Sequence, residues 1–275
     1  MTNQFLLTPY LLHEHAPALS GLARGDWRRN EPTLVGNAQS NRMIVLHRQI
    51  ATFVSESVRR GNRPVSVAGD CCSAIAVLAG LQQAGVDPVV IWLDAHGDFN
   101  TAETTVTGFL GGMPLAMITG RGDQTLMRGA SCRPVPDEDV LLTDARDLDP
   151  AEAGLLRDSA VRRVADPPAV VEALPPDRPL FVHFDTDFLN PLDAPAMLYP
   201  TAGGPRLADA LALAADLART NRVAAVSVTA WDLDGDGDRT TELACLQVLD
   251  ALLSGGAPAS PRTEDSTRGA RAHGG

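Results

Sequence analysis

The chain has 275 residues, of which 44% are hydrophobic and 21% charged, and its formal net charge is -11. This much apolar material can form one large folded core, which excludes a disordered or fibrous protein. The sequence contains arginine but no lysine, which excludes chemistry that needs a lysine amine, such as a Schiff base. Its acidic balance also argues against a nucleic-acid partner, because phosphate binding requires clustered positive charge.

Apolar stretches rich in valine and isoleucine alternate with longer segments of helical period. In chain order we expect a helix at 40–59, a strand at 64–68, a helix at 73–84, a strand at 88–94, a helix at 113–119, a strand at 140–143, a helix at 150–158, a strand at 161–164, a helix at 168–174, a strand at 180–184, a helix at 207–220, a strand at 223–228 and a helix at 240–253. Strand runs such as PVVIWLD and PLFVHFD are apolar on both faces, which is typical of a parallel sheet covered on both sides. We therefore predict an α/β fold with three α/β/α layers around a mainly parallel sheet.

A single domain is expected to span residues 1–253, because no interior linker or repeat divides the chain. Residues 254–275 are rich in glycine, alanine, serine and proline, and we predict a disordered tail there. No apolar run reaches about 18 residues, so we expect no membrane partner. The first residues lack the basic and apolar regions of a signal peptide, so we expect a cytoplasmic protein with reduced cysteines.

Acidic residues and a histidine follow two of the predicted strands. Asp94, His96 and Asp98 occupy alternate positions after one strand, and Asp185 and Asp187 repeat this spacing after another. Ligands of open α/β sheets bind outside the carboxyl ends of the strands, so these side chains can converge. Converging carboxylates would repel one another unless cations neutralise them, which predicts two divalent metal ions. Either cluster alone is also compatible with an ordinary turn.

Three motifs resemble those of the ureohydrolase (arginase/agmatinase) family. DAHGDFN at 94–100 is similar to the family's DAHxD motif, HFDTDFLNP at 183–191 to its SxDxDxxDP motif, and AGDCCSAIA at 68–76 to its GGDHSxxIG motif. The resemblance extends over most of the chain. It implies an arginase-like fold and the hydrolysis of a carbon–nitrogen bond in a linear amidine, with a small molecule as substrate.

The resemblance also implies ligands for two Mn²⁺ ions. Asp94 and Asp185 match the ligands that both ions share, and Asp98 matches a ligand that also relays a proton to the departing amine. The implied ligand set is Cys71, Asp94, His96, Asp98, Asp185 and Asp187.

Cys71 departs from the family pattern, because it stands where the family has a histidine. Its softer thiolate favours Zn²⁺, Fe²⁺ or Co²⁺ over Mn²⁺. Two alternatives stay open: Cys71 is a buried core residue, or its neighbour Cys72 is the true ligand.

The resemblance further implies the residues that bind substrate. Asn100 and Asp149 match positions that contact the amino-acid end of the substrate. Gly111 replaces a histidine of the arginases and would leave space beside the metals. His183 lies within a predicted strand, and we expect it to be a core residue whose polar atoms are satisfied.

The last predicted strand carries another departure. Ala230 stands where the family has a glutamate that pairs with the guanidinium, and Asp232 or Asp234 is a candidate to replace that carboxylate. A carboxylate within reach of the substrate would favour guanidine chemistry, whereas an apolar pocket around Trp231 would oppose it.

The leading hypothesis is therefore a binuclear metal hydrolase that acts on a guanidino or N-hydroxyguanidino compound. The loop TGFLGGM at 107–113 is similar to that of a branch of the family that hydrolyses Nω-hydroxy-L-arginine in antibiotic biosynthesis. The alternatives are a hydrolase for another amide or amidine, and a catalytically silent metal-binding relative. A homo-oligomer is compatible with each.

Overall fold

An eight-stranded parallel sheet forms the centre of the structure. A computed structural model describes residues 1–255, and in it the strands lie in the order β4-β1-β5-β10-β9-β6-β7-β8. These strands are β1 (Asn3–Thr8), β4 (Arg28–Arg29), β5 (Arg63–Ala68), β6 (Val89–His96), β7 (Val140–Asp147), β8 (Arg162–Val164), β9 (Leu180–Asp185) and β10 (Val223–Thr229). A separate antiparallel pair consists of β2 (Tyr10–Leu11) and β3 (Glu14–His15).

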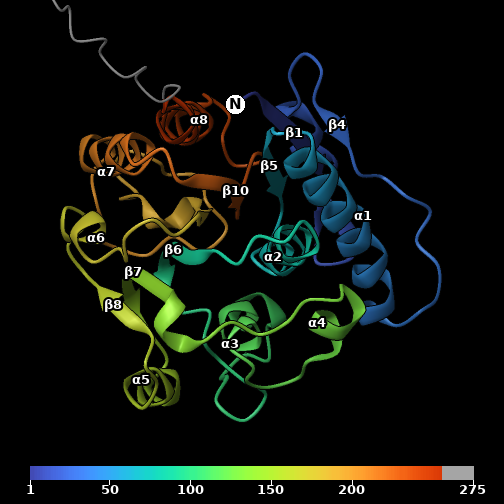
Figure 1. The fold of residues 1–275 in the computed structure, drawn as a ribbon, viewed down its shortest axis with the longest axis horizontal. Coiled ribbons are helices and arrows are strands. Elements are labelled where there is room, and N and C mark those ends of the chain that lie inside the picture. The colour runs from blue at the N-terminus through green and yellow to red at the C-terminus, as the bar shows by residue number, and fades with distance from the viewer. Residues whose placement is uncertain (256–275) are drawn as a thin grey trace, which may run out of the picture.

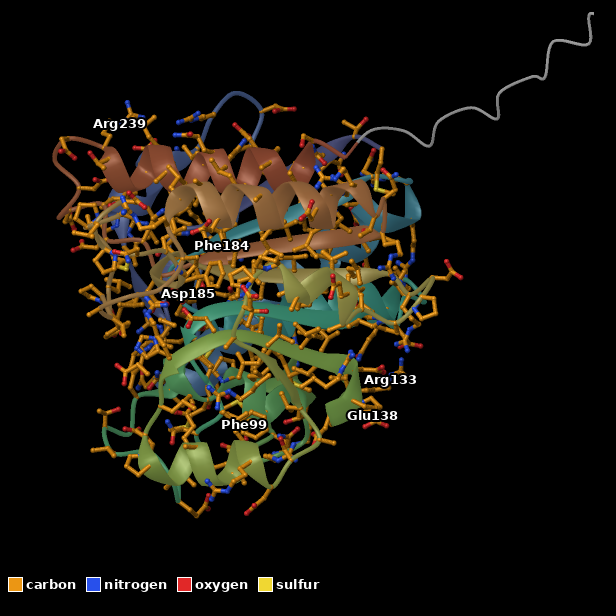
Figure 2. The ribbon with its side chains drawn as sticks, turned by 90° about the vertical axis from the view of Figure 1, so that its left-hand side faces the viewer. Phe99, Arg133, Glu138, Phe184, Asp185 and Arg239 are labelled. Carbon is orange, nitrogen blue, oxygen red and sulfur yellow. The ribbon has the colours of Figure 1, made fainter. Side chains whose placement is uncertain are left out.

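Helices cover both faces of the sheet (Figure 1). They are α1 (Gln39–Arg59), α2 (Ser73–Gln83), α3 (Pro114–Ile118), α4 (Thr125–Gly129), α5 (Pro150–Arg157), α6 (Ala169–Glu172), α7 (Leu207–Arg219) and α8 (Thr240–Leu253). Short 3-10 helices are η1 (Pro17–Leu22), η2 (Leu110–Gly112), η3 (Asp137–Asp139) and η4 (Thr186–Phe188). Helices α7 and α8 pack together on one side of the sheet, and α5 lies on the other side (Figure 2).

Each face of the sheet has its own apolar core, because successive strand residues point to opposite sides. On β6, Val90 and Trp92 belong to the core shared with α1 and α2, whereas Ile91 and Leu93 belong to the core shared with α7 and α8. All four side chains are buried. The two cores confirm the predicted three-layer α/β/α fold.

The predicted strands correspond to β5 through β10, and every predicted helix is present. Strands β1 to β4 and helix α4 were not predicted. Strand β1 has the sequence NQFLLT, without a β-branched core residue before Thr8, and its parallel pairing with β5 holds it in the sheet. Of the predicted tail, residues 256–275 lie outside the described part of the chain. Within residues 1–255, no helix has both the length and the apolar character needed to cross a membrane.

Because the strands are parallel, the segments that follow their carboxyl ends lie together along the same edge of the sheet. Asp185 ends β9 at this edge, whereas Glu138, which precedes β7, lies at the opposite edge (Figure 2). Strands β5, β10, β9, β6 and β7 are consecutive neighbours, so their carboxyl ends lie beside one another. This edge is where the predicted site residues meet.

Candidate metal centre and substrate cavity

A cavity of about 420 Å³ opens at the carboxyl ends of the central strands. The predicted site residues that line it are Cys71, His96, Asp98, Asn100, Gly111, Asp149, Asp185 and Asp187. Asp94 is buried, and its carboxylate Oδ1 lies 3.5 Å from Nδ1 of His96. The structure therefore brings together all the predicted site residues except Asp232.

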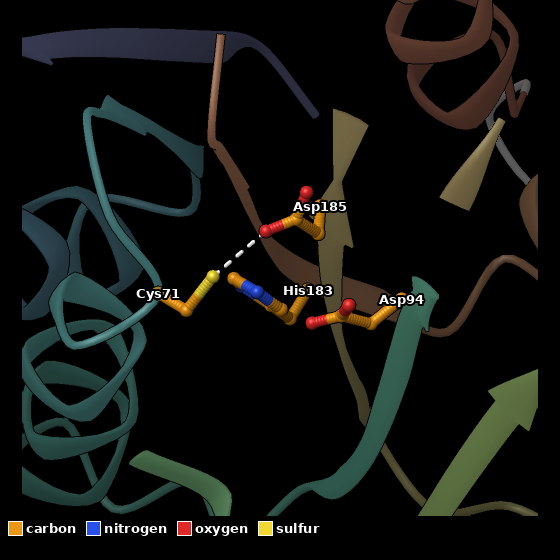
Figure 3. Close-up of side chains that lie close together, drawn as sticks. All are labelled: Cys71, Asp94, His183 and Asp185. Atoms are coloured by element: carbon orange, nitrogen blue, oxygen red, sulfur yellow. Dashed lines mark hydrogen bonds between the residues drawn. The ribbon is translucent and has the colours of Figure 1, made fainter. Parts of the chain in front are cut away.

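One group of metal-ligating atoms, here called the Cys71 cluster, comprises Cys71, Asp94, His183 and Asp185. One donor atom from each residue lies within 4.8 Å of the others, and all four residues are buried (Figure 3). Sγ of Cys71 donates a hydrogen bond to Oδ2 of Asp185 at 2.8 Å. The neighbouring Cys72 points elsewhere, because its Sγ donates to the carbonyl oxygen of Leu110. Position 71 is thus the cysteine that faces the carboxylates.

A second group, the His96 cluster, comprises Asp94, His96 and Asp187, again with donor atoms within 4.8 Å of one another. Nδ1 of His96 lies 3.0 Å from Oδ2 of Asp187. Asp94 belongs to both clusters, which is the arrangement expected of a carboxylate shared by two metal ions. Backbone N–H groups orient the carboxylates: His96 donates to Asp94, and Ala95 donates to Asp187.

The electrostatics of the two clusters favour bound cations. Burial, followed by the charge of Asp187, raises the pKa of Asp94 to about 7. Burial and the nearby carboxylates also raise the pKa of Asp185 and of the Cys71 thiol well above their ordinary values. Burial opposes the charge of His96, but hydrogen bonds with Asp187 and Asp94 outweigh it and raise its pKa to about 12. A divalent cation would offset this crowding of buried carboxylates, and the donor atoms of both clusters fit one.

Asp98 lines the same cavity but is a member of neither cluster. Its backbone has φ 49°, so the chain leaves the extended path of β6 at this residue. The side chain is buried in the cavity wall, and Oδ2 has no hydrogen-bond partner among the described residues. Burial, with the charge of Asp94 next, raises the pKa of Asp98 well above its ordinary value. A buried carboxylate with a free oxygen can accept or hold a proton beside the clusters.

His183 is the residue of the Cys71 cluster that sequence reasoning missed. We expected a core histidine with satisfied polar atoms, but Nε2 has no hydrogen-bond partner among residues 1–255. A signal was present, because His183 precedes Asp185 by the same alternate spacing that links Asp94 and His96.

The cavity wall carries further carboxylates. Nδ2 of Asn100 donates to Oδ2 of Asp149 at 3.2 Å, which places these two predicted substrate contacts side by side. Glu152 accepts hydrogen bonds from the backbone N–H groups of Phe99 and Asp149. Asp147 also lines the cavity, and its side chain is 61% exposed. This wall suits a substrate with a cationic or amine-bearing end.

The last strand contributes no carboxylate to the cavity. Ala230 lines it at φ 67°, and this left-handed conformation turns the chain away from the extended path of β10. Asp232 therefore lies in a turn, where Oδ1 accepts a hydrogen bond from the backbone N–H of Gly235. Trp231 is buried and is not among the residues that line the cavity. The structure thus places neither Asp232 nor an apolar Trp231 pocket beside the clusters.

Arg146 holds together the loops at the carboxyl ends of the strands, next to the cavity. From β7 its guanidinium donates to the carbonyl oxygens of Asp187, Leu189 and Thr201. One planar group with several N–H donors can hold separate loops together in this way. The position of Asp187 therefore depends on Arg146, whose role had no signal in the sequence.

Comparisons with known proteins agree with this geometry. Residues 23–254 match the family described as the Arginase family. The Nω-hydroxy-L-arginine amidinohydrolase of Streptomyces lavendulae is 38% identical over 162 residues, which cover 58% of this chain and 56% of that protein. The arginase of Bacillus caldovelox is 35% identical over 169 residues, covering 57% of this chain and 56% of that protein. The chain thus aligns with little more than half the length of these relatives. The crystal structure of arginase from Bacillus cereus has a TM-score of 0.81 at 22% identity, covers 92% of this chain and 99% of that chain, and shows the same fold.

Proposed function

Since the chain belongs to the Arginase family, we propose that it is a metal-dependent hydrolase that cleaves a carbon–nitrogen bond of a guanidino or N-hydroxyguanidino compound. The observation that carries this proposal is the shared position of Asp94 in two donor clusters beside one cavity. Two adjacent cation sites suit hydrolytic chemistry, because paired divalent ions lower the pKa of water to give a nucleophile near neutral pH.

The residues of this chain would divide the work in the following way. The Cys71 and His96 clusters hold the two ions, Mn²⁺ by analogy with the family or Zn²⁺, Fe²⁺ or Co²⁺ because of the thiolate. Asp98 accepts a proton at Oδ2 and passes it to the departing amine. Asn100 and Asp149, which also line the cavity, hold the amino-acid end of the substrate.

Among guanidino compounds, Nω-hydroxy-L-arginine is the substrate that we favour. A guanidinium ion always carries its charge and needs a carboxylate partner in a buried site. Ala230 supplies none, whereas an N-hydroxyguanidine is less basic and can bind uncharged. The similarity to the Streptomyces lavendulae enzyme supports the same choice. Water would add to the guanidine carbon, the bond to the side-chain nitrogen would break, and ornithine and hydroxyurea would form.

The test is a substrate screen with protein loaded separately with Mn²⁺, Zn²⁺ and Co²⁺. The substrates are Nω-hydroxy-L-arginine, L-arginine, agmatine, guanidinobutyrate and formiminoglutamate, and mass spectrometry detects hydroxyurea, urea and the released amines. We expect hydroxyurea to form faster than urea. Asp98→Asn should abolish turnover, whereas Asp232→Asn, which changes a carboxylate outside the cavity, should not. A metal-loaded protein that turns over none of these compounds would support a catalytically silent relative instead.

A further inference from the structure

The imidazole of His183 is held rigidly in the centre of the sheet. It is fully buried on β9, with Trp92 of β6 opposite it on one side and Ser227 of β10 opposite it on the other. The rings of His183 and Trp92 lie 3.8 Å apart between centroids with an interplanar angle of 30°. Nδ1 lies 2.7 Å from Oγ of Ser227. The contacts with Trp92 and Ser227 together fix the orientation of the ring.

In that orientation, the second ring nitrogen has no partner within the described residues. Nε2 of His183 is buried without a hydrogen bond, and an unmade hydrogen bond of a buried polar group costs roughly 1–3 kcal/mol. In the view of Figure 3 the ring lies between Cys71 and Asp94, with its far end toward Cys71. A donor atom of His183 lies within 4.8 Å of donor atoms of Cys71, Asp94 and Asp185. Nδ1 is already paired with Ser227, so Nε2 is the ring nitrogen that stays free to take a ligand role in this group.

We propose that Nε2 of His183 is a ligand of the metal ion held by the Cys71 cluster. This inference rests on the proposed metal-dependent function and adds a residue to it. A hydrogen bond from Nδ1–H to Ser227 leaves the lone pair on Nε2, which is how a partner on one ring nitrogen sets the other for metal binding. Cys71 and His183 then give this cluster a thiolate, an imidazole and two carboxylates.

The two metal positions would consequently differ in chemistry. Four donors that include sulfur and nitrogen match the tetrahedral sets that Zn²⁺ and Co²⁺ prefer. The His96 cluster offers one imidazole and two carboxylates without sulfur, a harder set that suits Mn²⁺. We therefore expect the first equivalent of Zn²⁺ to enter the Cys71 cluster.

Metal binding by the wild-type protein and three variants tests the ligand assignment. The variant is His183→Leu, and the matched control is His47→Leu, which also removes a buried imidazole with an unpartnered nitrogen but lies on α1, outside both clusters. Equilibrium dialysis against Zn²⁺ should show two ions in the wild-type and His47→Leu proteins. His183→Leu should lower the affinity for one of the two ions by about 100-fold or more. Ser227→Ala should lower the same affinity by about tenfold.

X-ray absorption of wild-type protein with one equivalent of Zn²⁺ gives a test that needs no variant. We expect sulfur and imidazole scattering in the same coordination shell. Sulfur without imidazole, imidazole without sulfur, or unchanged Zn²⁺ affinity in a folded His183→Leu variant would each overturn the assignment. A wild-type protein that binds no metal would overturn the proposed function itself, so the two failures are distinguishable.

Discussion

The ring of Phe109 occupies the space that a side chain at Gly111 would need. A Cβ atom at Gly111 would lie 2.2 Å from Cε1 of Phe109, closer than any two carbon atoms can approach without bonding. The same ring packs against Tyr199, with centroids 5.3 Å apart, and all three residues line the cavity. At Gly111, where the family has a histidine, we predicted open space. The ring of Phe109 fills that space instead.

Gly111→Ala should displace the Phe109 ring and change the cavity more than it changes the fold. Phe109 is only partly buried, so it can move at a cost to stability of about 1 kcal/mol. We expect a several-fold increase in KM with little change in melting temperature. Gly112→Ala is the control, because its Cβ would meet nothing within 4 Å. Equal effects of the two substitutions on KM would contradict the role of Phe109.

Asp94→Asn should remove both metal ions, because Asp94 is the residue common to the two clusters. A neutral amide is a poor bridging ligand, so neither position keeps its charge balance. Asp187→Asn, which alters the His96 cluster alone, should leave one ion in place. Elemental analysis of both purified variants measures the outcome. Two ions per chain in the Asp94→Asn protein would refute the shared position of this carboxylate.

The sequence predicted the sheet better than it predicted the site, for a physical reason. Strands β5, β6, β9 and β10 are buried on both faces, so their apolar runs are visible without knowing their neighbours. Strand β1 begins with Asn3 and Gln4, and only its pairing with β5 reveals it. The alternation of Asp94 and His96 indicated converging side chains because the strand continues through both. At Ala230 the chain turns with positive φ, and the alternation that suggested Asp232 stops there.

The acid sensitivity of the fold should depend in part on His47. Burial lowers the pKa of this histidine on α1 from 6.5 to about 4. The unfolded chain takes up a proton below pH 6.5 and the folded chain does not until about pH 4, so the stabilisation is complete above 6.5 and is lost as the pH falls between these values. The loss corresponds to about 3 kcal/mol of the free energy of unfolding.

His47→Leu should remove this part of the pH dependence. Urea unfolding of the wild-type and variant proteins at about pH 7 and about pH 4.5 gives the difference in the free energy of unfolding at each pH. We expect that difference to shift in favour of the variant at the lower pH. His15→Leu, at a side chain that is 48% exposed, is the control for the loss of an imidazole from the surface. Parallel pH profiles for the wild-type and His47→Leu proteins would show that the buried imidazole is not responsible.

Ala230→Glu should shift the substrate preference toward L-arginine. Ala230 lines the cavity with a Cβ already present at φ 67°, so a longer side chain adds no new class of backbone strain. The carboxylate can pair with a permanently charged guanidinium, and a charge-assisted hydrogen bond of this kind is worth about 1.5–3 kcal/mol. We expect kcat/KM for L-arginine to rise by about tenfold or more relative to Nω-hydroxy-L-arginine. Ala230→Gln has the same shape without the charge and should leave the ratio near its wild-type value. If glutamate and glutamine change the two substrates in parallel, the missing carboxylate does not set the substrate preference.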